Sequence, residues 1–201
     1  MIDGLRRTAL RANRWLGDSE ASSAIRGRLL HPYRRLRFHS FGRGALLDRP
    51  IWLAGVHKIA IGDGTVLLPN CWLSTSSATW HRPGAALLIG NNVTVNPHCS
   101  FSVASSVIVE DEVSIGSYSM MVDSLHRLDG PTNSIARNPS TSVPIRVGRG
   151  TRIGERVAVL RGSTIGRECI IGTNSVVQGK VPDYSIVTGN PARIVGTTRS
   201  S

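Results

Sequence analysis

The sequence predicts an all-β fold, a parallel β-helix of hexapeptide repeats preceded by a short helical segment. Three observations carry this prediction. An apolar residue recurs at every sixth position over long stretches, and glycine follows many of these positions. Aromatic residues make up only 5% of the chain although 40% of it is hydrophobic. A core with so few large rings must be filled by small and β-branched side chains.

The repeat is clearest in the C-terminal half of the chain. Every sixth position is occupied by Val or Ile at Val147, Ile153, Val159, Ile165, Ile171 and Val177. An α-helix cannot present a period of six on one face, and an ordinary strand would alternate every second residue. Three hexapeptides form about one coil of a triangular prism, so that each apolar residue stacks on its counterpart in the next coil.

The same phase continues upstream with interruptions, which defines the expected organisation of the chain. Further triplets are Ile61, Leu67 and Leu73; Ile89, Val95 and Phe101; Val109, Ile115 and Met121; and, more weakly, Phe41, Leu47 and Leu53. We expect a helical, basic N-terminal segment at 1–40, a β-helix at 41–182 with insertions near 79–88 and 127–146, and a C-terminal strand and tail at 183–201.

Three cysteines lie far apart and show no CxxC spacing. Cys71, Cys99 and Cys169 each stand four residues after a repeat residue, a position that is otherwise small or aliphatic. Their place in the repeat favours packing over nucleophilic chemistry, and their spacing suggests neither a disulfide framework nor a zinc site.

The formal charge of +11 restricts the partners without choosing among them. The basic segment at 1–40 has two interpretations: helices that cover the open end of the β-helix, or an amphipathic surface that rests on anionic lipid. No nucleic-acid-binding motif accompanies the charge, so we expect no nucleic-acid partner. No apolar run of signal-peptide or membrane-span length occurs, which predicts a cytoplasmic protein, with any membrane contact at the inner face.

The C-terminal stretch at 171–196 resembles the ending of hexapeptide-repeat acyltransferases of the maltose, galactoside and exopolysaccharide O-acetyltransferase type. The G-N-P-A-R/K element of that family is matched by Gly189, Asn190, Pro191, Ala192 and Arg193. The resemblance implies a left-handed β-helix and a homotrimer with sites between subunits. It also implies acyl-CoA as co-substrate, a carbohydrate-like hydroxyl as acceptor, and neither a permanently bound cofactor nor a metal.

Asp123 and His126 stand out in a coil otherwise built from small and aliphatic residues, directly before the longest insertion. The resemblance implies that His126 is the general base, because family members carry their essential histidine at this point. An imidazole suits that role since its ordinary pKa lies near neutrality. Asp123 fits the D-x-x-H form seen in part of the family, where it would hold the imidazole; the alternative is that it caps a turn.

The insertions supply the candidate acceptor contacts. An aromatic face suits a sugar ring, which makes Trp80 and its neighbour His81 candidates in the first insertion. The second insertion is longer and more polar than an idle connection. In the family it borders the acceptor, and the corresponding candidates are Arg127, Asn133 and Arg137.

The resemblance also places the pantetheine arm of coenzyme A over the last coils. Backbone groups around Ala158, Gly172 and Thr173 would face the arm, and Lys180 or Arg193 would meet the phosphates. The chain departs from the family at two points: the basic residue before the Pro turn is shifted by one position, and Glu155 stands where a small or neutral residue is common.

Two other functions are compatible with a β-helix. A zinc-dependent carbonic anhydrase of this fold needs three histidines on one metal, for which His81, His98 and His126 are the available trio. The second alternative is a non-catalytic β-helix scaffold that binds a partner.

Overall fold

The computed structural model of the protein describes residues 33–199. Most of the expected helical segment at 1–40 therefore lies outside the described residues. Its described part, from residue 33, begins with a helix at 33–37. Within the described part of the chain, no helix is long and apolar enough to cross a membrane.

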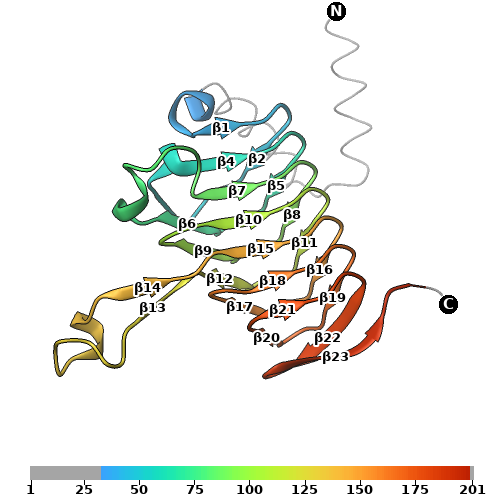
Figure 1. Cartoon of the computed structure of the whole chain (residues 1–201). Coiled ribbons are helices and arrows are strands. Elements are labelled where there is room, and N and C mark those ends of the chain that lie inside the picture. The colour runs from blue at the N-terminus through green and yellow to red at the C-terminus, as the bar shows by residue number, and fades with distance from the viewer. Residues whose placement is uncertain (1–32, 200–201) are drawn as a thin grey trace, which may run out of the picture.

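The strands form three parallel sheets that the chain visits in strict rotation, which coils it into a prism (Figure 1). The first sheet, sheet A, contains β1 (Ser40–Phe41), β4 (Ile59–Ile61), β7 (Leu87–Ile89), β10 (Val107–Val109), β15 (Ile145–Val147), β18 (Thr164–Ile165) and β21 (Lys180–Val181). Sheet B contains β2 (Leu46–Leu47), β5 (Val66–Leu67), β8 (Thr94–Val95), β11 (Ser114–Ile115), β16 (Arg152–Ile153), β19 (Ile170–Ile171), β22 (Ser185–Gly189) and β23 (Ala192–Thr197). Sheet C contains β3 (Trp52–Ala54), β6 (Trp72–Thr75), β9 (Ser100–Val103), β12 (Met120–Val122), β17 (Ala158–Leu160) and β20 (Val176–Val177).

Four shorter groups of residues complete the described elements. The antiparallel pair β13 (Ser124–His126) and β14 (Ser140–Ser142) lies outside the three sheets. Three short 3₁₀ helices are η1 (Val56–Lys58), η2 (Ser77–Thr79) and η3 (Ile135–Arg137).

The strand register confirms the period that the sequence predicts. Val147 pairs with Ile165 in sheet A, Ile153 with Ile171 in sheet B, and Val159 with Val177 in sheet C. Each pair joins residues three hexapeptides apart, so three repeats complete one coil. All six side chains are buried, as stacking of equivalent positions requires.

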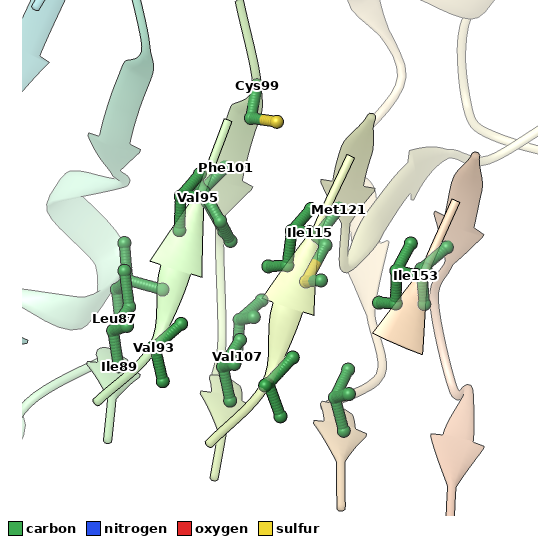
Figure 2. Close-up of a cluster of buried hydrophobic side chains, with 14 of the residues drawn as sticks. Leu87, Ile89, Val93, Val95, Cys99, Phe101, Val107, Ile115, Met121 and Ile153 are labelled. Carbon is green, nitrogen blue, oxygen red and sulfur yellow. The ribbon is translucent and has the colours of Figure 1, made fainter. Parts of the chain in front are cut away.

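The core is a continuous column of aliphatic side chains along the prism axis (Figure 2). Phe101 is the largest of its fully buried side chains, and Met121 fills the equivalent position in the next coil. The weaker first triplet is only partly confirmed. Phe41 and Leu47 are buried, whereas Leu53 is 36% exposed and lines a cavity at the end of the prism.

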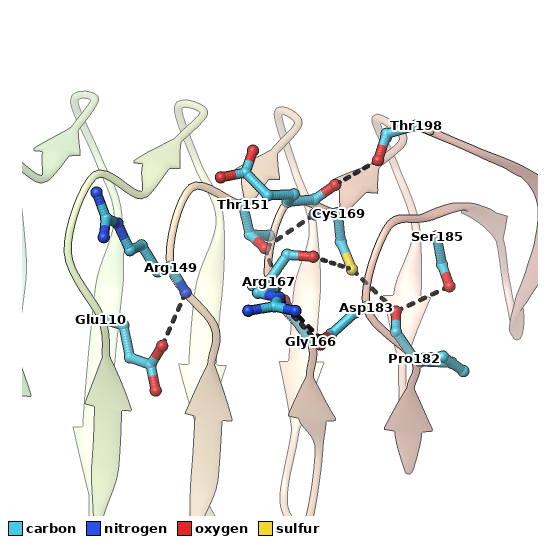
Figure 3. A network of polar contacts seen from close by, with 11 residues as sticks. Glu110, Arg149, Thr151, Gly166, Arg167, Cys169, Pro182, Asp183, Ser185 and Thr198 are labelled. Atoms are coloured by element: carbon cyan, nitrogen blue, oxygen red, sulfur yellow. Dashed lines mark hydrogen bonds and ion pairs between the residues drawn. The ribbon is translucent and has the colours of Figure 1, made fainter. Parts of the chain in front are cut away.

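The position four after a repeat residue is also buried in most of the regular turns, and its polar members reach across to the next coil. Thr65 Oγ1 donates to the Gly90 carbonyl at 2.6 Å, and Thr151 Oγ1 donates to the Gly166 carbonyl at 2.8 Å (Figure 3). Cys99 occupies the same position, and its Sγ lies 3.1 Å from the Gly116 carbonyl. A hydroxyl or a thiol can therefore replace an aliphatic group at this position, because a carbonyl of the next coil accepts its hydrogen bond.

Burial makes the cysteines poor nucleophiles, in agreement with the packing role predicted for them. Removal from water raises the pKa of the Cys71 thiol to about 11 and that of Cys99 to about 12, and it also raises the pKa of Cys169. Desolvation penalises the thiolate, which is the reactive form.

The coil continues past the expected end of the β-helix at residue 182. β22 adds to sheet B in parallel with β19, and β23 then turns back antiparallel on β22. Beyond β23, Thr198 Oγ1 donates to the Glu168 carbonyl (Figure 3). The last strand thus covers the outer edge of sheet B, where unpaired backbone groups would otherwise face solvent.

Close contact between coils explains why glycine recurs at the corners. A Cβ placed on Gly116 would lie 2.5 Å from the backbone carbon of Gly154 in the next coil. Backbone atoms cannot move aside as a flexible side chain can, so any larger residue must push two coils apart.

Gly116→Ala should therefore destabilise the fold, by about 1–3 kcal/mol, the usual cost of overpacking. Gly196→Ala is the matched control, because a Cβ there would meet Ile186 Cδ1 and Cβ at ordinary distances of 3.5 and 3.8 Å. Urea unfolding followed by circular dichroism measures both changes. Equal stability of the two variants would contradict the close-packing explanation.

Candidate active site

The irregular segments of the described chain lie along one corner of the prism, where the chain passes from sheet C to sheet A. Strands β6, β9 and β12 are neighbours in sheet C, and β7, β10 and β15 are neighbours in sheet A. The connections between them are residues 76–86, 104–106 and 123–144. These three segments consequently follow one another along the same corner, and the last of them projects away from the coil (Figure 1).

The projecting segment, residues 123–144, is called the arm below. Its base is the antiparallel pair β13 and β14, in which His126 lies opposite Ser140. The Arg127 amide extends the pairing by donating to the Pro139 carbonyl at 3.0 Å. Two further contacts fix the arm to the coil: the Gly162 amide donates to the Val143 carbonyl, and Arg161 Nη1 donates to Thr141 Oγ1.

The imidazole of His126 is exposed, and one of its two nitrogens has a hydrogen-bond partner among the described residues. Nδ1 lies 2.7 Å from the main-chain oxygen of Asn138. A carbonyl oxygen can only accept a hydrogen bond, so Nδ1 must carry the proton. In the neutral ring the lone pair is then on Nε2, which is the state that a general base requires.

Asn138 is the buried centre of the arm and was not predicted from the sequence. Its Nδ2 donates to the Arg127 carbonyl, while its Oδ1 accepts from the amide and the hydroxyl of Thr132. A Cβ on Gly130 would lie 2.1 Å from Asn138 Cγ, so the chain passes this side chain at a glycine. The sequence offered only a weak signal, the Asn-Pro dipeptide that is typical of turns.

Asp123 caps a turn, the alternative that the sequence left open. The side chain is fully buried, and its carboxylate accepts hydrogen bonds of 2.7–2.8 Å from the amides of Ala104, Ser105 and Ser106. Among the contacts of residues 33–199, the imidazole is held by the Asn138 carbonyl, and no hydrogen bond joins it to Asp123. The predicted orienting contact between Asp123 and His126 is therefore replaced, because the carboxylate already serves three backbone donors.

The candidate acceptor residues divide between two segments of the same corner. In residues 76–86, the half-exposed Trp80 donates from Nε1 to the Thr75 carbonyl, and its ring contacts His57 edge to face at 5.4 Å. His81 beside it is exposed. In the arm, Arg127 forms an exposed ion pair with Asp129, and both Asn133 and Arg137 are exposed.

A buried lysine anchors the first of these segments. Lys58 is 5% exposed, and its ammonium donates to the carbonyls of Arg82 and Gly84. A hollow of about 220 Å³ lies between residues 79–86 and the Ser105–Ser106 turn that Asp123 caps. Both walls of this hollow are consequently held by buried charged side chains.

The residues predicted to bind coenzyme A are spread over different faces. Ala158 lies in sheet C, Gly172 and Thr173 form the turn that follows sheet B, Arg193 lies in β23, and Lys180 lies in sheet A. Ala158 pairs with Val176 in sheet C, whereas Lys180 pairs with Thr164 in sheet A. One chain does not bring this whole set onto one face.

The zinc alternative is not assembled within a single chain. Across residues 33–199, no three His, Cys, Asp or Glu side chains gather in a way that could hold a metal ion. His98 instead stacks on the Tyr118 ring at 4.7 Å with an interplanar angle of 1°.

Sequence comparison finds relatives that are named acetyltransferases. The chain is 37% identical over 114 residues to the "Probable acetyltransferase Rv3034c" of Mycobacterium tuberculosis, a match covering 57% of this chain and 36% of that protein. It is 29% identical over 116 residues to the "Putative lipopolysaccharide biosynthesis O-acetyl transferase WbbJ" of Escherichia coli, covering 54% of this chain and 59% of that protein. The chain thus spans between about a third and three fifths of these curated relatives. No protein-family profile matches it.

Solved structures share the fold at low sequence identity. The hexapeptide-repeat acetyltransferase VCA0836 of Vibrio cholerae, solved with acetyl coenzyme A, superposes with a TM-score of 0.60 at 22% identity, covering 96% of this chain and 85% of that one. AntD, an N-acyltransferase of Bacillus cereus solved with dTDP and coenzyme A, gives 0.68 at 17% identity, covering 84% and 88%. The resemblance to hexapeptide-repeat acyltransferases is therefore present in sequence and in fold.

If Asp123 is a structural cap, Asp123→Asn should lower the free energy of unfolding by about 1–3 kcal/mol. One carboxylate oxygen would become an NH₂ group, which cannot accept hydrogen bonds from the backbone amides of the turn. Asp129→Asn is the matched control: Asp129 is exposed and pairs only with Arg127 on the surface, so the change should be within about 0.5 kcal/mol. Denaturant unfolding measures both variants. An Asp123→Asn protein as stable as the parent would refute the capping role.

Proposed function

We propose that this chain, a relative of proteins named acetyltransferases, is an O-acyltransferase that moves an acetyl or longer acyl group from acyl-CoA to a hydroxyl of a sugar or glycoside. His126 is the general base in this proposal. The single observation that carries it is the hydrogen bond between His126 Nδ1 and the Asn138 carbonyl, which leaves Nε2 free to accept a proton on the exposed arm.

The proposed reaction is a direct transfer. Nε2 of His126 removes the proton from the acceptor hydroxyl while the oxygen attacks the thioester carbon. The tetrahedral intermediate then collapses, the C–S bond breaks, and the imidazolium returns the proton to the departing coenzyme A thiolate. The Asn138 carbonyl stabilises the imidazolium meanwhile, because Nδ1–H becomes a charge-assisted donor to it.

In this proposal the two substrates occupy different parts of the prism. The acceptor lies at the corner between sheets C and A, near Trp80 and His81 and the arm residues Arg127, Asn133 and Arg137. The coenzyme A arm follows Ala158, Gly172 and Thr173, with Arg193 or Lys180 at the phosphates. A left-handed coil, as in hexapeptide-repeat proteins, belongs to the same proposal, and the fold shared with VCA0836 supports it.

His126→Ala should reduce turnover by roughly 10²–10⁴-fold, the usual contribution of a general base, while coenzyme A binding stays near that of the parent. Thiol release measured over a panel of acyl-CoA donors and sugar acceptors gives turnover, and calorimetry gives binding. His98→Ala is the matched control, because that ring stacks on Tyr118 away from the arm and its loss should leave turnover nearly unchanged.

The acceptor panel should contain each sugar in a hydroxyl form and an amino form. We expect the protein to prefer the hydroxyl form. Preference for the amino form would indicate N-acylation instead, the activity for which AntD is named. Near-parental turnover of His126→Ala would refute the base. One tightly bound zinc per chain would favour the carbonic anhydrase alternative, and no turnover with any pair would favour the scaffold.

We also propose a homotrimer, which the resemblance to hexapeptide-repeat acyltransferases implies. The arm supports contact between subunits, because it leaves its own coil and carries apolar side chains into solvent. Leu128 is 75% exposed, and Leu125 and Ile135 are each about half exposed. A second exposed apolar area lies on the outer face of sheet C, where Trp52 stacks on Trp72 at 5.2 Å. Exposed apolar surface of this kind is typical of interfaces between subunits.

Sedimentation equilibrium should therefore show a mass three times that of the 21.6 kDa chain. Leu128→Glu should shift the distribution towards smaller species, because a charge would enter the apolar contact of the arm. Leu36→Glu is the control, since Leu36 is also highly exposed, at 86%, but lies outside the arm. A monomer at assay concentration would contradict the trimer.

A further inference from the structure

A cavity of about 300 Å³ lies at the N-terminal end of the prism, between the helix at 33–37 and the chain that leaves β3. Its lining residues are Tyr33, Arg34, Arg37, Phe38, Leu53, Gly55 and Val56. The apolar members cover most of the wall, and the two arginines supply the charge. The volume is at the lower end of the range found for small-molecule sites.

The guanidinium of Arg34 makes this cavity unusual. Arg34 is only 8% exposed, and its Nη1 has no hydrogen-bond partner among the residues that the structure describes. Burial lowers the pKa of Arg34, although the attraction of Asp48 opposes this effect. The guanidinium nevertheless stays protonated in proteins, so a cationic donor remains buried with one nitrogen unsatisfied.

Such a donor is costly to leave unpaired, which makes an anion the natural partner. A buried polar group without a hydrogen bond carries the full penalty of its desolvation, and the penalty is larger for a charged group. Guanidinium groups match the oxygens of phosphates and carboxylates, which they bind with two parallel hydrogen bonds. Arg37, on the same wall, adds a second positive charge and donates to the Tyr33 hydroxyl at 2.6 Å.

The rest of the wall selects for an apolar body behind the anionic head. Phe38 is buried and packs edge to face on Phe41 at 5.4 Å, while Leu53 is partly exposed at the rim. These side chains offer no polar atoms to a sugar or nucleotide, but they gain from covering a hydrocarbon chain.

We infer that this cavity binds an amphiphilic anion, an organic phosphate or carboxylate with a short apolar chain, whose head pairs with Arg34 and whose chain packs on Phe38, Leu53 and Val56. The site does not depend on the function proposed above. It lies at the β3 edge of sheet C, whereas the arm with His126 follows β12, with β6 and β9 between them.

Calorimetric titration of the full chain with octyl phosphate tests the inference, with inorganic phosphate and octanol as the two half-ligands. Octyl phosphate should bind more tightly than either. Arg34→Gln should weaken its binding by about tenfold to a hundredfold, the range expected for a hydrogen-bonded charge pair. Arg35→Gln is the matched control, because Arg35 is exposed on the same helix and does not line the cavity.

A second variant, Leu53→Trp, should fill the cavity and abolish octyl phosphate binding without removing a charge. Circular dichroism melting of each variant confirms that it is folded. Vesicles containing anionic lipid form a separate arm, which distinguishes a headgroup in a bilayer from a free amphiphile. Absence of octyl phosphate binding would overturn the inference, as would binding that Arg34→Gln and Leu53→Trp leave unchanged. Equal losses with Arg34→Gln and Arg35→Gln would indicate only general attraction to the basic surface.

Discussion

Hydrogen bonding between successive coils is the constraint on which the rest of this structure depends. The amides of one coil donate to carbonyls of the next, as Gly62 does to Ile89 and Gly148 does to Ile165. The strands are only two to six residues long, so no strand is stable by itself. Stability therefore requires every coil to lie in register with its neighbour, and that register places each buried side chain directly over the equivalent one.

The same constraint explains where the chain can depart from regularity. Extra residues can be inserted at a corner only if the next strand resumes the register of the coil. After the arm, β15 does so by pairing with β10. The inserted residues lose the ladder that satisfies their backbone groups, and buried polar side chains replace it. Asp123 forms hydrogen bonds with the backbone of the turn at 104–106, Asn138 with the backbone of the arm, and Lys58 with the backbone of the first insertion. The polar residues buried near the candidate site thus support the irregular backbone around it.

The coil and the irregular corner therefore have different roles: the coil is the scaffold, and the corner contributes the reactive groups. The coil supplies a fixed scaffold of Val, Ile and small residues, with its thiols buried and deactivated. The corner between sheets C and A contributes exposed groups. Within residues 33–199, it is the one place where a backbone carbonyl holds an imidazole. At the β3 edge of sheet C, the Arg34 cation, whose Nη1 has no hydrogen-bond partner among the described residues, marks a second place where binding of a ligand would lower the free energy of the folded chain.

The sequence by itself determined the coil, its period, most of the buried positions and the approximate residues of the insertions. These properties depend on a local pattern that repeats, and Val147, Ile153 and Val159 carry it in the letters alone. It also singled out His126 and left two roles open for Asp123. The pattern extends less reliably to the end of the prism, where Phe41 and Leu47 are buried but Leu53 stays 36% exposed.

The tertiary structure alone decided which polar groups meet. The partner of His126 is a main-chain oxygen twelve residues away, and a carbonyl has no identity in the sequence. Asp123 finds its three donors in the turn of the preceding coil, and the Arg34 Nη1 atom is buried without a hydrogen-bond partner among the described residues. Such contacts depend on the path of irregular backbone and on burial, which a repeat pattern does not encode.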